Sequence, residues 1–274
     1  MTRKWLPRML LFGGAAIAGL MMACAMTRPS NDRVWSEDQA ILPFAEIEGN
    51  EVTIRNIRNF RYEPEGRQRA AYYDRTFDLR QLESVWFIVV PFGGIEGIAH
   101  TFVSFGFGPQ GYVAISAEIR KEQGETYSPL RGLLRQYELM YVIGDERDLI
   151  QLRTHIHEDD VHLYPIRTDS AKMRTMFLEM IERANKLARE PEFYNTVTNS
   201  CTMNLVRHVN TISPRRVPFS YRVLLPGYSD SLALELGLID TDVSLEQLRA
   251  RYRINEAAER FTDDPEFSMR IREE

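Results

Sequence analysis

The sequence predicts an α+β domain, and three features of its 274 residues lead to this prediction. Apolar and β-branched runs of strand length dominate the chain up to about residue 165, and helix-period patterns dominate after it. Strand runs followed by helical runs are typical of a sheet with helices packed against it. The composition, 44% hydrophobic and 27% charged, is that of an ordinary globular domain that can bury a core without disulfides.

The predicted strands either alternate apolar and polar residues or are continuously apolar. In chain order they are "EVTIRNI", "TFDL", "SVWFIVVPF", "IAHTFVSF", "YVAISAEIR", "YELMYVI" and "VHLYPI". Residues 31–50 are expected to form an extended segment before them, and "ERDLIQLRTHI" fits a helix or a strand. The turn sequence Gly108-Pro109-Gln110-Gly111 lies between two strand runs and predicts a hairpin.

The clearest helix is predicted from about Ser170 to Arg189, because apolar residues recur there at spacings of three and four. Asp169 or Ser170 can cap its start, and Pro191 follows its end. Its methionine-rich face is interpreted as core packing, since methionine fills irregular gaps in cores.

Further helices are predicted at residues 128–136, from residue 199 or 200 to Pro214, and in "SDSLALELGL" and "SLEQLRARYR". The last dozen residues are charged and are expected to fray. The domain organisation is therefore predicted as a leader at 1–30, a single domain at 31–240, and a C-terminal helix with a charged tail at 241–274.

The first 30 residues are typical of an export segment, with basic residues followed by an uncharged, mostly apolar run. Ala23-Cys24-Ala25 has the form of a signal-peptidase site, and Met21-Met22-Ala23-Cys24 resembles a lipoprotein box with Cys24 as the lipidated residue. The run is also near the minimum length of an uncleaved anchor. We favour membrane attachment slightly over cleavage and expect the remainder on the far side of the membrane.

Charge and histidine patterns exclude some classes of function. The net charge is −5 and its basic residues are interspersed with acidic ones, so no nucleic-acid partner is indicated. His155, His157 and His162 cluster with Asp159 and Asp160, and the first two would share a strand face. Because no spaced carboxylate or cysteine pattern supports a metal there, we expect no metal site and no cofactor.

Cys201 is the one cysteine outside the leader, so the domain cannot form an internal disulfide. Burial as a small apolar residue explains most lone cysteines. Here, however, Asn199 or Ser200 is a good N-cap, which puts Cys201 in the first helical turn. Amide groups and the helix dipole favour a thiolate at that position, which suits a covalent nucleophile.

His100 is the candidate base for Cys201. His208 lies two turns further along the same helix, roughly 10 Å away, and is expected to be at the surface or partly buried. Counting back from the hairpin turn places His100 opposite Ile119, and a shift of one residue would place it opposite Glu118. A carboxylate there would fix the imidazole tautomer and leave the other nitrogen for the thiol.

Several motifs resemble a known family, in the same order along the chain. They are "VTIRNIRNFRY", "IAHTFVSFGF", "ISAEIRKEQGETYS", "LRQYELMYVIGDERDLIQLR" and "NSCTMNL". Over residues 32–240 the chain resembles the periplasmic domain of the alternative bacterial lipoprotein N-acyltransferases called Lnb. The resemblance implies a circularly permuted, papain-like (NlpC-type) fold, with an antiparallel sheet packed against helices.

The resemblance also implies roles for individual residues. Cys201 would be the nucleophile, His100 the base and Glu118 the third polar group. Asn199, Ser200 and Thr202 are candidates for the oxyanion site, although the family motif has asparagine directly before the cysteine and threonine where Met203 stands. Many relatives continue into a membrane-embedded region that is not seen here, which leaves room for a separate membrane-embedded partner.

The leading hypothesis is a cysteine acyltransferase on the periplasmic side of a bacterial membrane. It would move an acyl chain from a phospholipid donor through a Cys201 thioester to the N-terminal amine of a lipoprotein. A papain-like cell-wall peptidase or amidase would use the same residues with a different acceptor. A non-enzymatic envelope assembly protein with an inert Cys201 is the third alternative.

Overall fold

The computed structural model describes residues 27–62, 68–239 and 242–273, which form the predicted α+β fold. Within these residues one nine-stranded sheet has the order β1-β2-β9-β8-β7-β6-β10, with β5 beside β2 and β11 beside β9. The strands are β1 Phe44–Glu48, β2 Glu51–Arg58, β5 Tyr72–Asp78, β6 Ser84–Pro91, β7 Ala99–Gly106, β8 Tyr112–Arg120, β9 Glu138–Asp145, β10 His162–Pro165 and β11 Glu192–Phe193. The short strands β3 Arg61–Tyr62 and β4 Gln68–Arg69 form a separate pair.

The sheet is mixed, because β2 and β9 run parallel where Arg58 meets Gly144. The expectation of a wholly antiparallel sheet was therefore wrong at this one junction. The other strand pairs are antiparallel, including β6 with β7 and β8 with β9 at the centre. Residues at the centre of the sheet are buried on both faces, which explains the continuous apolar runs of β6, β7 and β9.

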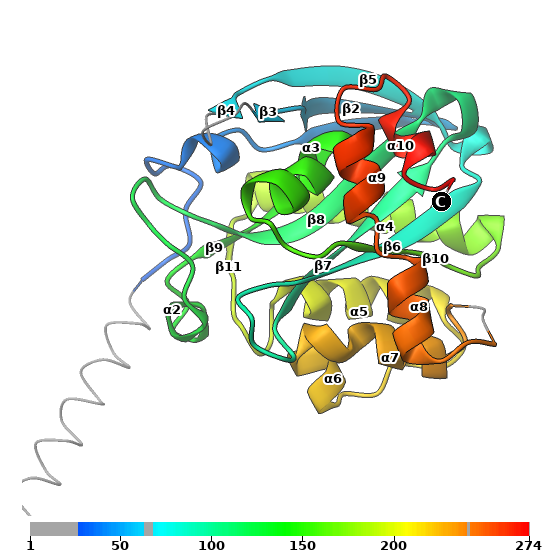
Figure 1. Ribbon diagram of the computed structural model, residues 1–274. Coiled ribbons are helices and arrows are strands. Elements are labelled where there is room, and N and C mark those ends of the chain that lie inside the picture. Colours follow the sequence, from blue (N-terminus) through cyan, green and yellow to red (C-terminus); the bar gives the residue numbers. More distant parts are fainter. Residues whose placement is uncertain (1–26, 63–67, 240–241, 274) are drawn as a thin grey trace, which may run out of the picture.

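Helices cover both faces of the sheet (Figure 1). The first layer holds α4 Ser170–Arg189, α5 Cys201–Ile212, α6 Tyr221–Leu224, α7 Ser229–Glu235 and α8 Leu245–Arg251. The second layer holds α3 Glu146–Gln151, α9 Asn255–Arg260 and α10 Phe267–Arg270, and α2 Pro129–Leu133 lies beyond the sheet edge. Two cores result, the first core between the sheet and the first helix layer and the second core between the sheet and the second layer. Because successive side chains of a strand point to opposite faces, Val103 and Phe105 lie in the first core and Phe102 lies in the second.

The long helix α4 confirms its prediction at both ends. Asp169 accepts a hydrogen bond from the amide of Lys172 at 2.9 Å, which caps the helix start. Met176, Phe177 and Met180 are buried against the sheet, as the spacing of apolar residues predicted.

The predicted hairpin is formed by β7 and β8, and its register differs by one residue from the count based on the turn. Gly106 pairs with Tyr112 and Val103 with Ile115, where the pairing ends; extended beyond these pairs, the same count places His100 level with Glu118. The count from the sequence gave Ile119 because it took Gly108–Gly111 as the whole connection. In the structure Phe107 also belongs to the connection, and the 3₁₀ turn covers Gly108–Gln110. This alignment is the one that the shift of a single residue was expected to produce.

The C-terminal segment is packed, so the expectation of a frayed tail was wrong. Phe267 and Ile271 are buried in the second core, and Arg272 pairs with the buried Glu146 at 2.5 Å. The ambiguous segment "ERDLIQLRTHI" is helical, with α3 followed by a π-helical turn at Leu152–Ile156.

The predicted leader and Cys24 lie outside the described residues, apart from residues 27–30 at its end. In the parts of the chain that the structure describes, no helix is long and apolar enough to cross a bilayer.

Candidate active site

Cys201 is the first residue of α5, because Ser200 caps the helix directly before it. The Ser200 hydroxyl accepts a hydrogen bond from the amide of Met203 at 3.3 Å, and the backbone of Ser200 is extended. Helix α5 packs against β7 and β8 in the core between the sheet and the first helix layer. The thiol therefore lies where amide groups and the helix dipole favour a negative charge, as the sequence predicted.

His100 lies where β7 and β8 separate. The paired residues of the two strands end at Val103 and Ile115, although β7 begins at Ala99 and β8 continues to Arg120. In the opening beyond that pair, His100 Nε2 lies 2.7 Å from the Ser116 hydroxyl oxygen and 3.4 Å from Glu118 Oε1. The structure therefore brings His100 and Glu118 together, with Ser116 between them.

The hydroxyl of Ser116 fixes the tautomer of His100. Its single proton is donated to Glu118 Oε1 at 2.9 Å, so towards His100 the hydroxyl oxygen acts as an acceptor. Nε2 of His100 must then carry a proton, which leaves Nδ1 of the neutral ring as the basic nitrogen. Nδ1 is the nitrogen available for the hydrogen bond between His100 and Cys201.

The Cys201 thiol is activated by this histidine. Burial alone would raise the pKa of the thiol, but the hydrogen bond and charge of His100 outweigh burial and lower the pKa to about 7. The amide of Thr101 and the hydroxyl of Thr202 also stabilise the thiolate, and Thr202 Oγ1 lies 3.7 Å from the sulfur. A substantial fraction of Cys201 is therefore a thiolate at neutral pH.

Glu118 and His100 stabilise each other's charged form. Burial disfavours the imidazolium and Arg153 repels it, yet the hydrogen bonds to Cys201 and Glu118 prevail and raise the pKa of His100. Burial would also raise the pKa of Glu118, but His100 and then Arg153 lower it below its usual range. Arg153 Nη2 lies 3.9 Å from the Glu118 carboxylate, so Glu118 stays ionised.

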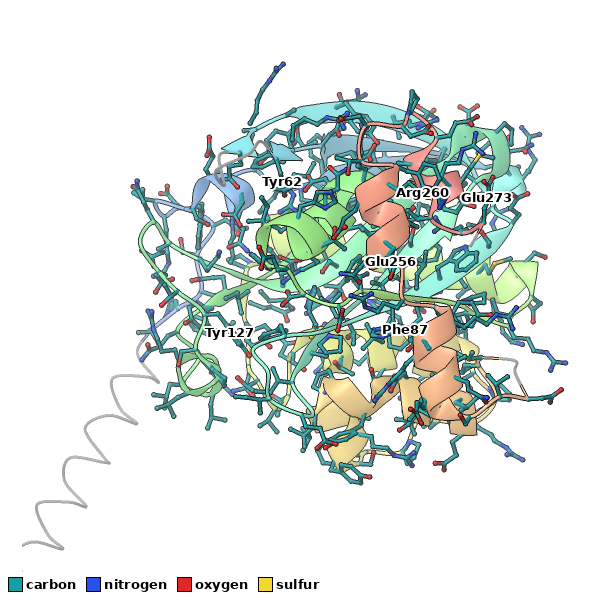
Figure 2. The ribbon with its side chains drawn as sticks, viewed as in Figure 1. Tyr62, Phe87, Tyr127, Glu256, Arg260 and Glu273 are labelled. Atoms are coloured by element: carbon teal, nitrogen blue, oxygen red, sulfur yellow. The ribbon has the colours of Figure 1, made fainter. Side chains whose placement is uncertain are left out.

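Two tyrosines lie close enough to the sulfur to interact with its charge. Tyr127 and Tyr194 are hydrogen-bonded to each other, and burial, followed by the charge of Cys201, raises the pKa of Tyr194. Burial likewise raises the pKa of Tyr127, so its hydroxyl keeps its proton and can donate it. Tyr127 lies between β8 and α2, where its ring contacts Phe92 of the β6–β7 loop (Figure 2).

The three predicted oxyanion residues have different surroundings. Asn199 is tied down, because its amide donates to the carbonyl of Phe193 and its side-chain oxygen accepts from Asn204 and Arg207. The Ser200 hydroxyl serves as the helix cap. Of the three side chains, Thr202 alone has a hydrogen-bonding contact with the sulfur, and its hydroxyl also lies 3.1 Å from that of Thr101.

The other histidines have structural contacts. His208 is buried, more fully than the surface or partly buried position that was expected, and its ring bonds the hydroxyl of Tyr141 at 2.8 Å. His155 bonds Thr262 and sits in the π-helical turn, so it does not share a strand face with His157. Among the described residues, no group of three or more His, Cys, Asp or Glu side chains is placed to hold a metal ion.

Ser116, Arg153, Tyr127 and Tyr194 were missed by sequence reasoning. Ser116 carried a usable signal, because it is two residues before Glu118 and so lies on the same face of the strand. The other three reach the site from a π-helical turn and from loops beside α2 and α5, and no periodicity marks them.

We expect Glu118→Gln to raise the pKa of Cys201. The substitution removes the charge that stabilises the His100 imidazolium, so the thiolate beside it also becomes less stable. The midpoint of alkylation by iodoacetamide, followed on the Cys201 peptide, should rise by about one pH unit, the lower end of the usual effect of an opposite charge. Alkylation at neutral pH should accordingly become slower.

Glu122→Gln is the matched control for this experiment, because Glu122 follows β8 and forms a more exposed pair with Arg33. Its alkylation midpoint should stay that of the unsubstituted protein. An unchanged midpoint in Glu118→Gln would show that Glu118 does not stabilise the His100 charge.

The comparison with protein families gives one match. The model of the Lnb N-terminal periplasmic domain matches residues 68–227, which is more than half of the chain and includes Cys201, His100 and Glu118. No curated protein and no solved structure matches the chain. The matched domain is periplasmic, and the chain belongs to the Lnb-type lipoprotein N-acyltransferase family.

Proposed function

We propose that the protein is a cysteine acyltransferase that moves a fatty acyl chain from a phospholipid to the N-terminal amine of a lipoprotein. The observation that carries the proposal is the pairing of a thiol of lowered pKa with a histidine whose tautomer is fixed by Ser116 and Glu118. Membership of the Lnb-type family supports this substrate class. Thiol and imidazole in this arrangement are the groups that acyl transfer requires.

In the first step, Cys201 Sγ attacks the ester carbonyl carbon of the phospholipid while Nδ1 of His100 takes the thiol proton. The C–S bond forms, the ester C–O bond breaks, and His100 returns the proton to the departing alkoxide of the lysophospholipid. The negative oxygen of the intermediate is stabilised by amide groups at the start of α5 and by the Tyr127 hydroxyl. Each such donor contributes roughly 10²–10³ in rate.

In the second step, the α-amine of the lipoprotein attacks the thioester carbonyl. His100 takes a proton from the attacking nitrogen, the amide C–N bond forms, and the C–S bond breaks to restore the thiolate. Glu118 stabilises the imidazolium that forms in both steps. The scheme predicts ping-pong kinetics with a covalent acyl-enzyme.

The finer fold assignment forms part of this proposal. A strand-borne His100 that precedes a helix-borne Cys201 supports a circularly permuted, papain-like arrangement of the NlpC type. We further propose that residues 1–30 attach the domain to the membrane, as an anchor or through a lipid on Cys24. Attachment would hold the site near both lipid substrates, with or without a separate membrane-embedded partner.

The proposal is tested by incubating the purified full-length chain with a phospholipid that carries radiolabelled acyl chains. We expect a protein adduct that hydroxylamine releases, and blocking of the thiols with iodoacetamide beforehand should prevent it. Addition of a synthetic diacylated lipopeptide with a free N-terminal amine should transfer the label to that amine.

Three results would contradict the proposal. Loss of label to water, unaffected by the lipopeptide, would indicate a hydrolase. Release of peptides from isolated cell wall without any labelled adduct would indicate the peptidase that the same residues can support. No adduct and no release would leave a non-enzymatic role for the domain.

We expect His100→Ala to slow adduct formation by about 10²–10⁴-fold, the usual contribution of a positioned base. The variant loses both the proton acceptor and the partner that lowers the pKa of Cys201. Single-turnover rates with the labelled phospholipid measure the effect, and circular dichroism checks the fold.

His155→Ala is the matched control, because His155 bonds Thr154 and Thr262 and has no interaction with Cys201. It should form the adduct at the unsubstituted rate. Equal rates for His100→Ala and the unsubstituted protein would exclude His100 as the base.

A further inference from the structure

An apolar cavity of about 170 Å³ lies between the sheet and the first helix layer. Its floor comes from β6 and β7, where Phe87 lies at the junction of the sheet and these helices (Figure 2). Helices α4 and α7 form further walls, and α5 runs along its length. The α5 residues that line it are Thr202, Leu205, Val206, Val209 and Ile212.

Thr202 connects the wall of this cavity to the Cys201 sulfur. Thr202, which lines the cavity, places its hydroxyl 3.7 Å from Sγ. Val103 lines the opposite wall and lies two residues after Thr101, whose amide donates to the same sulfur. From Thr202 the lining follows one face of α5 to Ile212, a rise of roughly 15 Å for ten residues.

The chemistry of the walls selects an uncharged, apolar occupant. Most of the lining residues are aliphatic, aromatic or methionine, and native cores rarely leave such space unfilled. Two cationic lining residues already have carboxylate partners, since Lys172 pairs with Asp169 and Arg222 with Glu235, each at 2.6 Å. A peptide or saccharide would leave its polar groups without partners there.

We propose that this cavity is the chamber for the fatty acyl chain carried on Cys201, which rests on the acyl transfer proposed above. The thioester carbonyl sits at Sγ beside Thr202, and the chain extends along α5 past Val209 towards Ile212. Met173 and Met176 of α4 line the chamber, and their flexible side chains adapt to chains of different shape. The chamber therefore sets which acyl lengths form a thioester.

We expect Val209→Trp to separate long acyl chains from short ones. The indole fills the middle of the chamber, two turns beyond Thr202, and leaves the space beside the sulfur unchanged. Adduct formation from the palmitoyl p-nitrophenyl ester should fall by roughly 10- to 200-fold, the usual cost of lost fit in an apolar pocket. Adduct formation from the butyryl ester should stay at the unsubstituted rate, which also shows that the variant is folded.

Val34→Trp is the matched control, because Val34 is exposed and lies outside the chamber. It should process both esters like the unsubstituted protein. The chamber would be overturned if Val209→Trp formed both adducts at the unsubstituted rates. It would also be overturned if the palmitoyl and butyryl adducts were slowed by the same factor.

A binding measurement separates failure of the chamber from failure of the acyl-transfer reaction. The fluorescent fatty acid cis-parinaric acid should bind the full-length Cys201→Ala variant, and adding Val209→Trp should weaken that binding by about tenfold or more. Binding without any acyl adduct in the unsubstituted protein would support the chamber and contradict acyl transfer. An adduct without binding of the probe, or with binding unaffected by Val209→Trp, would contradict the chamber.

Discussion

Cys201→Ala is expected to abolish the hydroxylamine-sensitive acyl adduct, a loss of more than about 10⁴-fold in covalent turnover. The substitution removes the atom that forms the thioester and leaves Ser200, His100 and Glu118 in place. Alanine occupies nearly the same small volume at the first position of α5, so the fold should be retained. Label incorporation from phospholipid, measured after removal of noncovalent lipid, gives the result.

Cys24→Ser is the control for this prediction, because Cys24 is the other cysteine of the chain. It should retain the full adduct, which assigns the thioester to position 201. A hydroxylamine-sensitive adduct that persists in Cys201→Ala would place the acyl group elsewhere and remove the basis of the proposed mechanism.

The position of Cys201 could be predicted because it depends on local chemistry. A serine hydroxyl caps the helix amides that follow it, so the sequence around Ser200 is sufficient to start α5 at Cys201. Helix α4 was predictable at both ends for the same kind of reason, with Asp169 as its cap. These features require no knowledge of which segments pack together.

The pairing of His100 with Glu118 was predicted less securely, because it depends on the length of a connection. A connection of four residues would place His100 opposite Ile119. The observed connection also includes Phe107, which shifts the register by one residue, towards Glu118. A single residue of difference moves every side chain of a strand relative to its partner. The sequence therefore identified the two residues but left their alignment open.

Ser116, the tyrosine pair and the acyl chamber could not be predicted, since each depends on packing between distant segments. Tyr127 precedes β9 in the chain and Tyr194 follows β11, and the chamber needs β6, α4, α5 and α7 together. The periodicity of apolar residues predicts single helices and strands, but it carries no information about contacts between distant ones. The family resemblance supplied roles for Cys201, His100 and Glu118 but no role for these residues.

The buried pair of Arg58 and Asp148 connects the end of β2 to the second helix layer. Asp148 accepts hydrogen bonds from Arg58 Nε and Nη2 at 3.0 Å each, from the amide of Phe60 at 2.8 Å and from the Tyr62 hydroxyl at 2.6 Å. Both charged side chains are almost wholly inaccessible to solvent. Asp148 lies on α3, which leads into the turn that brings Arg153 to Glu118.

Asp148→Ala is therefore expected to lower the free energy of unfolding by about 3–5 kcal/mol, the usual cost of removing one partner from a buried ion pair. The variant leaves the Arg58 guanidinium buried without its carboxylate and removes the acceptor for Phe60 and Tyr62. Since whole domains are stabilised by only about 5–15 kcal/mol, a large part of the population would unfold under mild denaturant. Urea unfolding, followed by tryptophan fluorescence and circular dichroism, measures the difference.

Asp160→Ala is the matched control, because Asp160 pairs with Arg253 at 2.6 Å and both side chains are well exposed. Water screens that pair and already solvates both groups, so its loss should cost no more than about 1 kcal/mol. Each substitution removes one carboxylate from one arginine, but Asp148→Ala does so in a buried site and also removes the acceptor for Phe60 and Tyr62. Equal stabilities for the two variants would mean that Arg58 finds water or another acceptor when Asp148 is gone, and that α3 is held in place by apolar packing alone.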